Sequence, residues 1–163
     1  MTERELLDLL HQRYDQLVGN GQRWVAAEKV RSLAGWGYGE LRTCDFMAQD
    51  CWTGLQLHGM EVKTSRADWL RELKDPAKAE AFRPYCHRWW LVTSSPAVAT
   101  KAELPAGWGL LTVGLRGLRC VITAPRLAAD PVPRQMQVTL LRAAARTAVR
   151  RDALLARTRH AAS

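Results

Sequence analysis

The hydrophobic residues of the first part of the chain recur at helical spacing. Over residues 2–19 a leucine-rich stripe follows the 3.6-residue period, and Thr2 with Glu5 fits a capping box. The same spacing predicts a second helix over about residues 24–33, which carries Glu28. The following Gly-Trp-Gly-Tyr-Gly segment, residues 35–39, predicts a loop whose glycines allow a ligand to approach closely.

From about residue 41 the pattern changes to the two-residue period of strands. It predicts strands over 41–48 and 55–64, with a turn at 50–54 between them. Residues 66–83 return to helical spacing in two pieces, because Asp75-Pro76 begins a new helix. Three further strands are predicted over 88–93, 109–115 and 118–123, before a long Arg/Ala/Leu-rich helix over about 133–159.

The resulting order, α-α-β-β-α-β-β-β-α, predicts an α/β or α+β fold, in which helices flank a mixed central sheet. The 163 residues fit one ordinary domain plus an extension. Because the proline-containing stretch 125–133 is typical of a short linker, we predict a domain over 1–125 and a linker with a basic terminal helix over 126–163.

Positive charge is concentrated in this C-terminal segment. Residues 1–125 hold 16 Lys and Arg against 14 Asp and Glu, whereas residues 126–163 hold 8 Arg against 2 Asp. Such a surface favours polyanions such as DNA, although it is also typical of a solvated helix face. Arg142, Arg146 and Arg150 recur near helical spacing and would contact a DNA backbone, while the apolar residues of this helix suit packing on the core or on a second copy.

The chain shows no signal for a membrane or for export. No apolar run approaches the ~18–20 residues of a membrane span, and the first residues lack an apolar secretory signal. We therefore expect a cytoplasmic protein without a membrane partner, in which the four cysteines are reduced.

Glu61 and Lys63 are the sharpest chemical feature of the sequence. On a strand they point to one face, while Met60 and Val62 point to the other. Asp45 is unexpected in the preceding strand, and a hairpin would bring it beside Glu61. Two carboxylates and the Val62 carbonyl suit Mg²⁺ or Mn²⁺, and Lys63 would orient water or offset charge on a phosphate. Taken alone, Glu-x-Lys also fits an exposed ion pair.

Five sequence pieces follow one another around these residues. They are Cys44-Asp45, MEVKTSRADWL (60–70), ELKDPAK (72–78), YCHRWW (85–90) and LPAGWGLL (104–111). An Asp on one strand before Glu-x-Lys on the next resembles the PD-(D/E)xK nuclease superfamily. The stretch from Arg42 to about Val113 is more closely similar to the MmcB-type DNA repair proteins and their phage-encoded relatives. This stretch covers a little under half of the chain.

This resemblance implies a restriction-endonuclease-like αβββαβ core. It also implies a divalent-metal-dependent endo- or exodeoxyribonuclease that works in DNA repair or processing. By position, Asp45 and Glu61 become metal ligands and Lys63 the catalytic lysine. Glu28 matches an additional acid that such nucleases often carry, which would bind the metal through water, although an exposed helical acid is the alternative. The proline-containing half of the signature is degenerate, since Trp36 to Tyr38 stands there instead.

Other residues near the motif are candidates for binding DNA. Ser65 and Arg66 begin a predicted helix, whose N-terminus favours phosphate, although Arg66 also suits a structural ion pair. Lys78 would face the cleft or the surface. Trp36 and Tyr38 lie in the glycine-rich loop and suit base stacking.

The rival interpretation is a DNA-binding scaffold that keeps the nuclease fold and acts through partner proteins. The intact set of Asp45, Glu61 and Lys63 favours catalysis. RNA as the substrate, and a homodimer or a repair protein as the partner, stay open at this point.

Overall fold

The computed structural model describes residues 1–19, 21–33 and 40–161 and contains a six-stranded mixed sheet. The strands lie in chain order, with β3, β4 and β5 antiparallel, β5, β6 and β7 parallel, and β8 antiparallel to β7. Their bounds are β3 (Trp24–Arg31), β4 (Thr43–Asp50), β5 (Leu57–Lys63), β6 (Arg88–Thr93), β7 (Trp108–Gly114) and β8 (Gly117–Ile122). A separate short hairpin pairs β1 (Leu17–Val18) with β2 (Gly21–Gln22).

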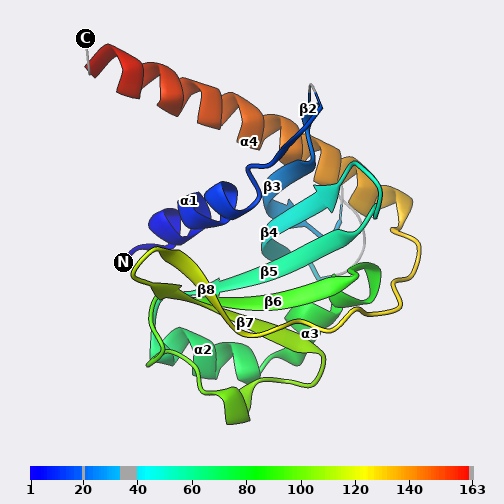
Figure 1. Ribbon diagram of the computed structural model, residues 1–163. Helices are drawn as coiled ribbons and strands as arrows, with labels where there is room; N and C mark the ends of the chain where they lie inside the picture. The colour runs from blue at the N-terminus through cyan, green and yellow to red at the C-terminus, as the bar shows by residue number, and fades with distance from the viewer. Residues whose placement is uncertain (20, 34–39, 162–163) are drawn as a thin grey trace.

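Helices flank this sheet, which confirms the predicted mixed α+β class. The helices are α1 (Glu3–Arg13), α2 (Arg66–Leu73), α3 (Pro76–Glu80) and α4 (Arg134–Ala161), with two short 3-10 turns, η1 (Arg83–Tyr85) and η2 (Lys101–Glu103). In Figure 1, α1 lies on one face of the sheet, α2 and α3 lie on the other, and α4 runs along β3. Within the described residues, no helix is long and apolar enough to cross a membrane.

Local signals place several of the helix ends correctly. The predicted capping box begins α1, since the Thr2 hydroxyl accepts the Glu5 N–H at 3.3 Å and the Glu5 carboxylate accepts the Thr2 N–H at 2.7 Å. Pro76 stands at the start of α3 and divides the helical stretch in two, as predicted. The first helix ends at Arg13 rather than at residue 19, because the chain then turns into the β1–β2 hairpin.

The prediction of a second helix over residues 24–33 is wrong, because this segment forms strand β3. It pairs with β4 from Trp24–Asp50 to Arg31–Thr43. Its Ala-Ala-Glu-Lys centre favours helix locally, but pairing with β4 and packing against α4 outweigh that preference. α4 even bonds the strand directly, since the Thr147 hydroxyl accepts the Glu28 N–H at 3.0 Å.

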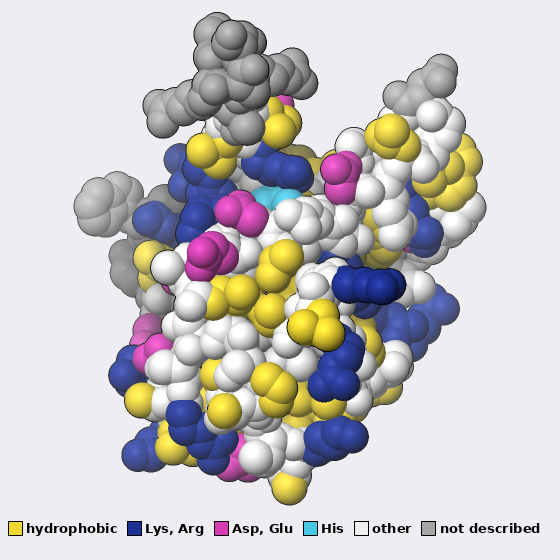
Figure 2. All heavy atoms as spheres, turned by 60° about the vertical axis from the view of Figure 1, so that its left-hand side comes forward, with side chains coloured by type: hydrophobic (Ala, Val, Ile, Leu, Met, Phe, Trp, Pro, Cys, Tyr) yellow, Lys and Arg dark blue, Asp and Glu magenta, His cyan; other side chains and the backbone are white. Residues whose placement is uncertain are grey.

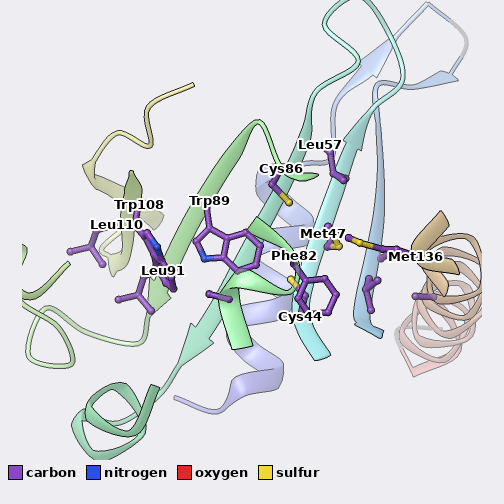
Figure 3. Close-up of a cluster of buried hydrophobic side chains, with 14 of the residues drawn as sticks. Cys44, Met47, Leu57, Phe82, Cys86, Trp89, Leu91, Trp108, Leu110 and Met136 are labelled. Atoms are coloured by element: carbon purple, nitrogen blue, oxygen red, sulfur yellow. The ribbon is translucent and has the colours of Figure 1, made fainter. Parts of the chain in front are cut away.

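Two hydrophobic clusters fill the two faces of the sheet. One contains Trp69, Phe82 and Trp89 together with Met136 and Ala143 of α4, and Figure 3 shows its central side chains. The other packs the leucines of α1 against apolar residues of β4, β5 and β6. Since α4 contributes to the first cluster, the segments 1–125 and 126–163 share one core.

Gly59→Ala is expected to destabilise the fold by about 1–3 kcal/mol through overpacking. A Cβ at Gly59 would lie 2.2 Å from Cζ3 of Trp89, which is itself fully buried and has no room to move. Urea unfolding would measure the loss. Gly21→Ala is the matched control, because nothing lies within 4 Å of the Cβ position at Gly21. Equal stability of the two variants would contradict the expectation.

Candidate active site

Asp45 lies where strands β4 and β5 stop pairing. The pairing runs from Gln49–Leu57 to Phe46–Met60. Beyond this point the Asp45 carboxylate enters between the strands, and its Oδ2 accepts the backbone N–H of Val62 at 2.9 Å. The antiparallel hairpin thus brings Asp45 beside the Glu61–Lys63 segment, as the sequence predicts.

Glu61 and Lys63 share one face of β5, as the strand alternation predicts, and this is the face on which Glu72 of α2 lies. Met60 and Val62 belong to the hydrophobic cluster on the opposite face, under α1. Glu61 is fully buried, and its Oε2 lies 3.4 Å from the Lys63 ammonium. The pair is therefore not the exposed surface pair that Glu-x-Lys alone permits.

Glu72 of α2 and Lys78 of α3 complete this side of the site. Lys78 donates to Oε2 of Glu61 at 2.7 Å and to Oε2 of Glu72 at 3.1 Å. Lys63 lies 2.7 Å from the same Glu72 oxygen. The prediction that Lys78 faces the cleft is thus supported by its position. The sequence did not indicate Glu72 as a site residue, and the only feature that pointed to it is its place in the ELKDPAK piece.

Lys29 is a third lysine that the sequence did not indicate. Its backbone adopts a left-handed conformation, with φ of 52°, inside strand β3. This conformation is uncommon for a residue other than glycine. The Lys29 ammonium donates to Oδ1 of Asp45 at 2.7 Å and also pairs with Glu3 at the start of α1. Because the sequence pattern predicts a helix over residues 24–33, it does not indicate that Lys29 reaches Asp45.

The site perturbs the ionisation of its members in opposite directions. Burial, together with the neighbouring Asp45 carboxylate, raises the pKa of Glu61 to about 8. Burial alone would also raise the pKa of Asp45, but the Lys29 and Lys63 ammonium groups and the Val62 N–H together outweigh burial and lower that pKa. Burial would lower the pKa of Lys78, whereas the Glu61 carboxylate holds it above the usual range. Burial thus disfavours a charge on Glu61, while lysines favour the charge on Asp45.

A cavity of about 440 Å³ is lined by Asp45, Lys63, Glu72 and Lys78, together with Val62 and Thr64, while Glu61 is buried next to Lys63 and Lys78. The charged lining residues are the acids Glu3, Asp45, Asp68, Glu72 and Asp75 and the bases Lys63, Arg71 and Lys78. The acids exceed the bases by two, so the cavity favours a cation over a bare phosphate.

Asp45, Glu61 and Val62 carry the oxygen atoms that would hold a hard divalent cation. Glu61 Oε1 is buried and has no hydrogen-bond partner among the described residues, and the Asp45 carboxylate and Val62 lie at the neighbouring cavity. Carboxylate and carbonyl oxygens supplemented by water are the ligands that Mg²⁺ prefers. The described residues contain no group of three His, Cys, Asp or Glu arranged to hold a metal, so such an ion would take most of its other ligands from solvent or substrate.

Glu28 does not join this site. Because β3 pairs with β4, Glu28 lies opposite Phe46, on the face away from Glu61 and Lys63. Its carboxylate accepts from Arg4 at 2.8 Å, contacts His11 Nε2 at 2.6 Å and pairs with Arg150. The helical position expected for Glu28 is therefore wrong, and the structure gives its carboxylate a role in holding α1 and α4 to β3.

Ser65 and Arg66 are occupied by structural contacts. The Ser65 hydroxyl caps α2 by accepting the Asp68 N–H at 3.2 Å, and it donates to the Asp68 carboxylate at 2.8 Å. Arg66 pairs with Glu103, at 2.6 Å for one nitrogen, and reaches the Val98 carbonyl at 3.2 Å. Arg66 thus follows the structural alternative rather than the predicted phosphate contact.

The remaining candidates for DNA binding divide into three cases. Trp36 and Tyr38 lie outside the described residues. Arg142 and Arg146 are exposed on α4, whereas Arg150 pairs with Glu28. On the face shown in Figure 2, Lys and Arg side chains form separate patches, some of them beside Asp and Glu side chains and others among apolar ones. The basic surface predicted for α4 is thus reduced by the ion pair of Arg150.

Comparisons with known proteins bear on the fold. No protein-family model matches the chain, and no curated protein matches it. Among solved structures, a protein of unknown function from Silicibacter pomeroyi is similar, with 25% sequence identity and a TM-score of 0.53. The similarity covers 82% of this chain and 80% of that chain.

Proposed function

We propose that this chain is a divalent-metal-dependent deoxyribonuclease with a restriction-endonuclease-like core, acting in DNA repair or processing. The convergence of Asp45, Glu61 and Lys63 carries the proposal, since Asp45 and Lys63 line an acidic cavity and the buried Glu61 pairs with Lys63 and Lys78, which also lines it. The order of elements supports it, since α1, β3, β4, β5, α2 and β6 give α-β-β-β-α-β when the short β1–β2 hairpin, α3 and η1 are left aside. This is the order that the resemblance to PD-(D/E)xK nucleases implies.

The carboxylates of Asp45 and Glu61, with the carbonyl of Val62, would hold Mg²⁺ or Mn²⁺. Such an ion supplies a more acidic water and offsets the charge that develops on the phosphate. The acidic excess of the cavity explains why DNA would need this ion, because a phosphodiester alone meets net negative charge there.

Lys63 and Lys78 are the side chains that would contact the attacking water and the DNA phosphate. Both ammonium groups lie at the cavity, and each is a compact charge with three N–H donors. Lys63, beside Glu61, would orient the attacking water or donate to the scissile phosphate. Lys78, on the other side of the Glu61 carboxylate, would bind a phosphate oxygen and hold the strand in place.

One observation favours the rival function, a DNA-binding scaffold without catalysis. Lys29 and Lys78 already neutralise Asp45 and Glu61, so these carboxylates are charge-balanced without a metal. In that case the lysines would keep the acids of an inactive site folded, and the exposed Arg142 and Arg146 would supply the DNA contacts.

Cleavage of labelled single-stranded, duplex and branched DNA by the purified chain separates the two functions. We expect cutting with Mn²⁺ or Mg²⁺ and none with EDTA. Binding without cutting on every substrate and with either metal would refute the nuclease and favour the scaffold. Labelled RNA of the same sequence tests the remaining choice of substrate.

A further inference from the structure

Glu72 occupies an unusual position for a glutamate near the end of a helix. Glu72 is the last but one residue of α2. The Asp75-Pro76 turn follows and begins α3, whose Lys78 lies next to Glu72. The side chain of Glu72 is only 9% exposed, although α2 also has a solvent face on which a glutamate would be hydrated at no cost.

One oxygen of Glu72 joins the two lysines of the candidate site. Oε2 lies 2.7 Å from the Lys63 ammonium and 3.1 Å from that of Lys78. Lys63 is closer to Glu72 than to Glu61, which lies 3.4 Å away. A lysine ammonium on a flexible four-carbon stem has no fixed position of its own, so its location depends on such partners.

The other oxygen of Glu72 is not explained by a structural role. Oε1 is buried and has no hydrogen-bond partner among the described residues, and the same is true of the Trp69 indole nitrogen. Both residues line a second cavity of about 80 Å³ beside the large one. A buried, half-satisfied carboxylate costs stability, so its presence is better accounted for by what it does at the site.

We propose that Glu72 is a positioning residue that fixes Lys63 and Lys78 together against the phosphate-binding side of the cavity. This inference rests on the proposed nuclease function. It adds a residue from α2, and it explains why the ELKDPAK piece places an acid and a lysine six positions apart. The reacting groups are held by β4 and β5, and Glu72 aligns the lysine donors with them.

Glu72→Gln tests the proposal, because it keeps the size of the side chain and removes its charge. We expect kcat for DNA cleavage to fall about 10- to 100-fold, and the DNA dissociation constant to rise because Lys78 would bind a phosphate oxygen, while the chain stays folded. Glu72→Asp keeps the charge one methylene further away, and we expect intermediate activity. Glu80→Gln is the matched control, since Glu80 is exposed on α3 and pairs only with Arg83 among the described residues.

A second readout does not depend on activity. In ¹⁵N spectra of lysine-labelled protein, ammonium groups held in place by carboxylates exchange slowly enough to give signals. We expect the Lys63 and Lys78 signals to weaken in Glu72→Gln and to persist in Glu80→Gln. If the wild-type chain cuts no DNA but the signals behave as expected, the nuclease proposal fails while the positioning of the lysines stands.

Three results would overturn the inference. Unchanged kcat in Glu72→Gln would show that the lysines need no such anchor. Unfolding of both Glu72→Gln and Glu72→Asp would make the carboxylate a requirement of the fold. Ammonium signals that persist in Glu72→Gln would show that Glu61 alone holds the lysines.

Discussion

Glu61→Gln is expected to lower metal-dependent DNA cleavage by about 10²–10³-fold or more. The substitution replaces a carboxylate oxygen by an amide nitrogen that repels a cation, at a position fully buried beside the cavity. The fold should survive, because Gln has the shape of Glu and burial already raises the pKa of Glu61 to about 8. Lys78 also keeps Glu72 as a partner.

Lys63→Met separates the binding of the metal from the chemistry. It removes the ammonium at the cavity but leaves Asp45 and Glu61 in place. Calorimetric titration with Mn²⁺ should therefore show binding to Lys63→Met and none to Glu61→Gln, while both variants lose cleavage. Lys74→Met is the matched control, since Lys74 is exposed at the end of α2. Undiminished cutting by Lys63→Met and Glu61→Gln would rule out the proposed mechanism.

The part of this site that lies on β5 could be predicted because strand alternation is a local property. Once residues 55–64 are a strand, Glu61 and Lys63 must share a face and Met60 must take the other. The hairpin that places Asp45 nearby is almost as local, since β4 and β5 are adjacent in the chain. Neither property predicts finer details, such as the hydrogen bond from the Val62 N–H to Asp45.

The rest of the site depends on partners far away in the sequence. Residues 24–31 have helical preferences, and only pairing with β4 and cover from α4 make them a strand. This error placed Glu28 on a helix and concealed Lys29, whose left-handed backbone brings its ammonium to Asp45. Glu72 was missed for a different reason, since helix periodicity does not say which strand a helix end will meet.

Glu28→Gln is expected to destabilise the fold by about 1–3 kcal/mol. The Glu28 carboxylate is 4% exposed and is bound by Arg4 and His11 of α1 and by Arg150 of α4. Removing its charge takes the counterion from Arg150, leaves Arg4 with Asp8 as its remaining partner, and weakens the hydrogen bond with His11. Asp8→Asn is the matched control, because Asp8 also pairs with Arg4 but is half exposed, and such pairs contribute about 0.2–1 kcal/mol.

The loss should depend on pH in a defined direction. Burial alone would raise the pKa of Glu28, but hydrogen bonds from His11, Arg4 and Arg150 outweigh it and hold the pKa well below the usual 4.5. A carboxyl group whose pKa is lowered by folding stabilises the protein above its unfolded-state pKa, and this contribution is lost as the pH falls. Urea unfolding should therefore show the largest difference between wild type and Glu28→Gln near pH 7 and a shrinking difference below about pH 4.5.

The same variant decides between the two roles considered for Glu28. A metal-binding acid would lose cleavage on substitution, with little change in stability. An acid that holds α1 and α4 to β3 would lose stability, while the molecules that stay folded would cut DNA as the wild type does. Because Glu28 lies on the opposite face of the sheet from Glu61 and Lys63, we expect the second result. Cleavage measured at low temperature, where Glu28→Gln is still folded by circular dichroism, gives the comparison. Loss of cleavage under these conditions, together with wild-type stability, would show that Glu28 acts as a metal-binding acid.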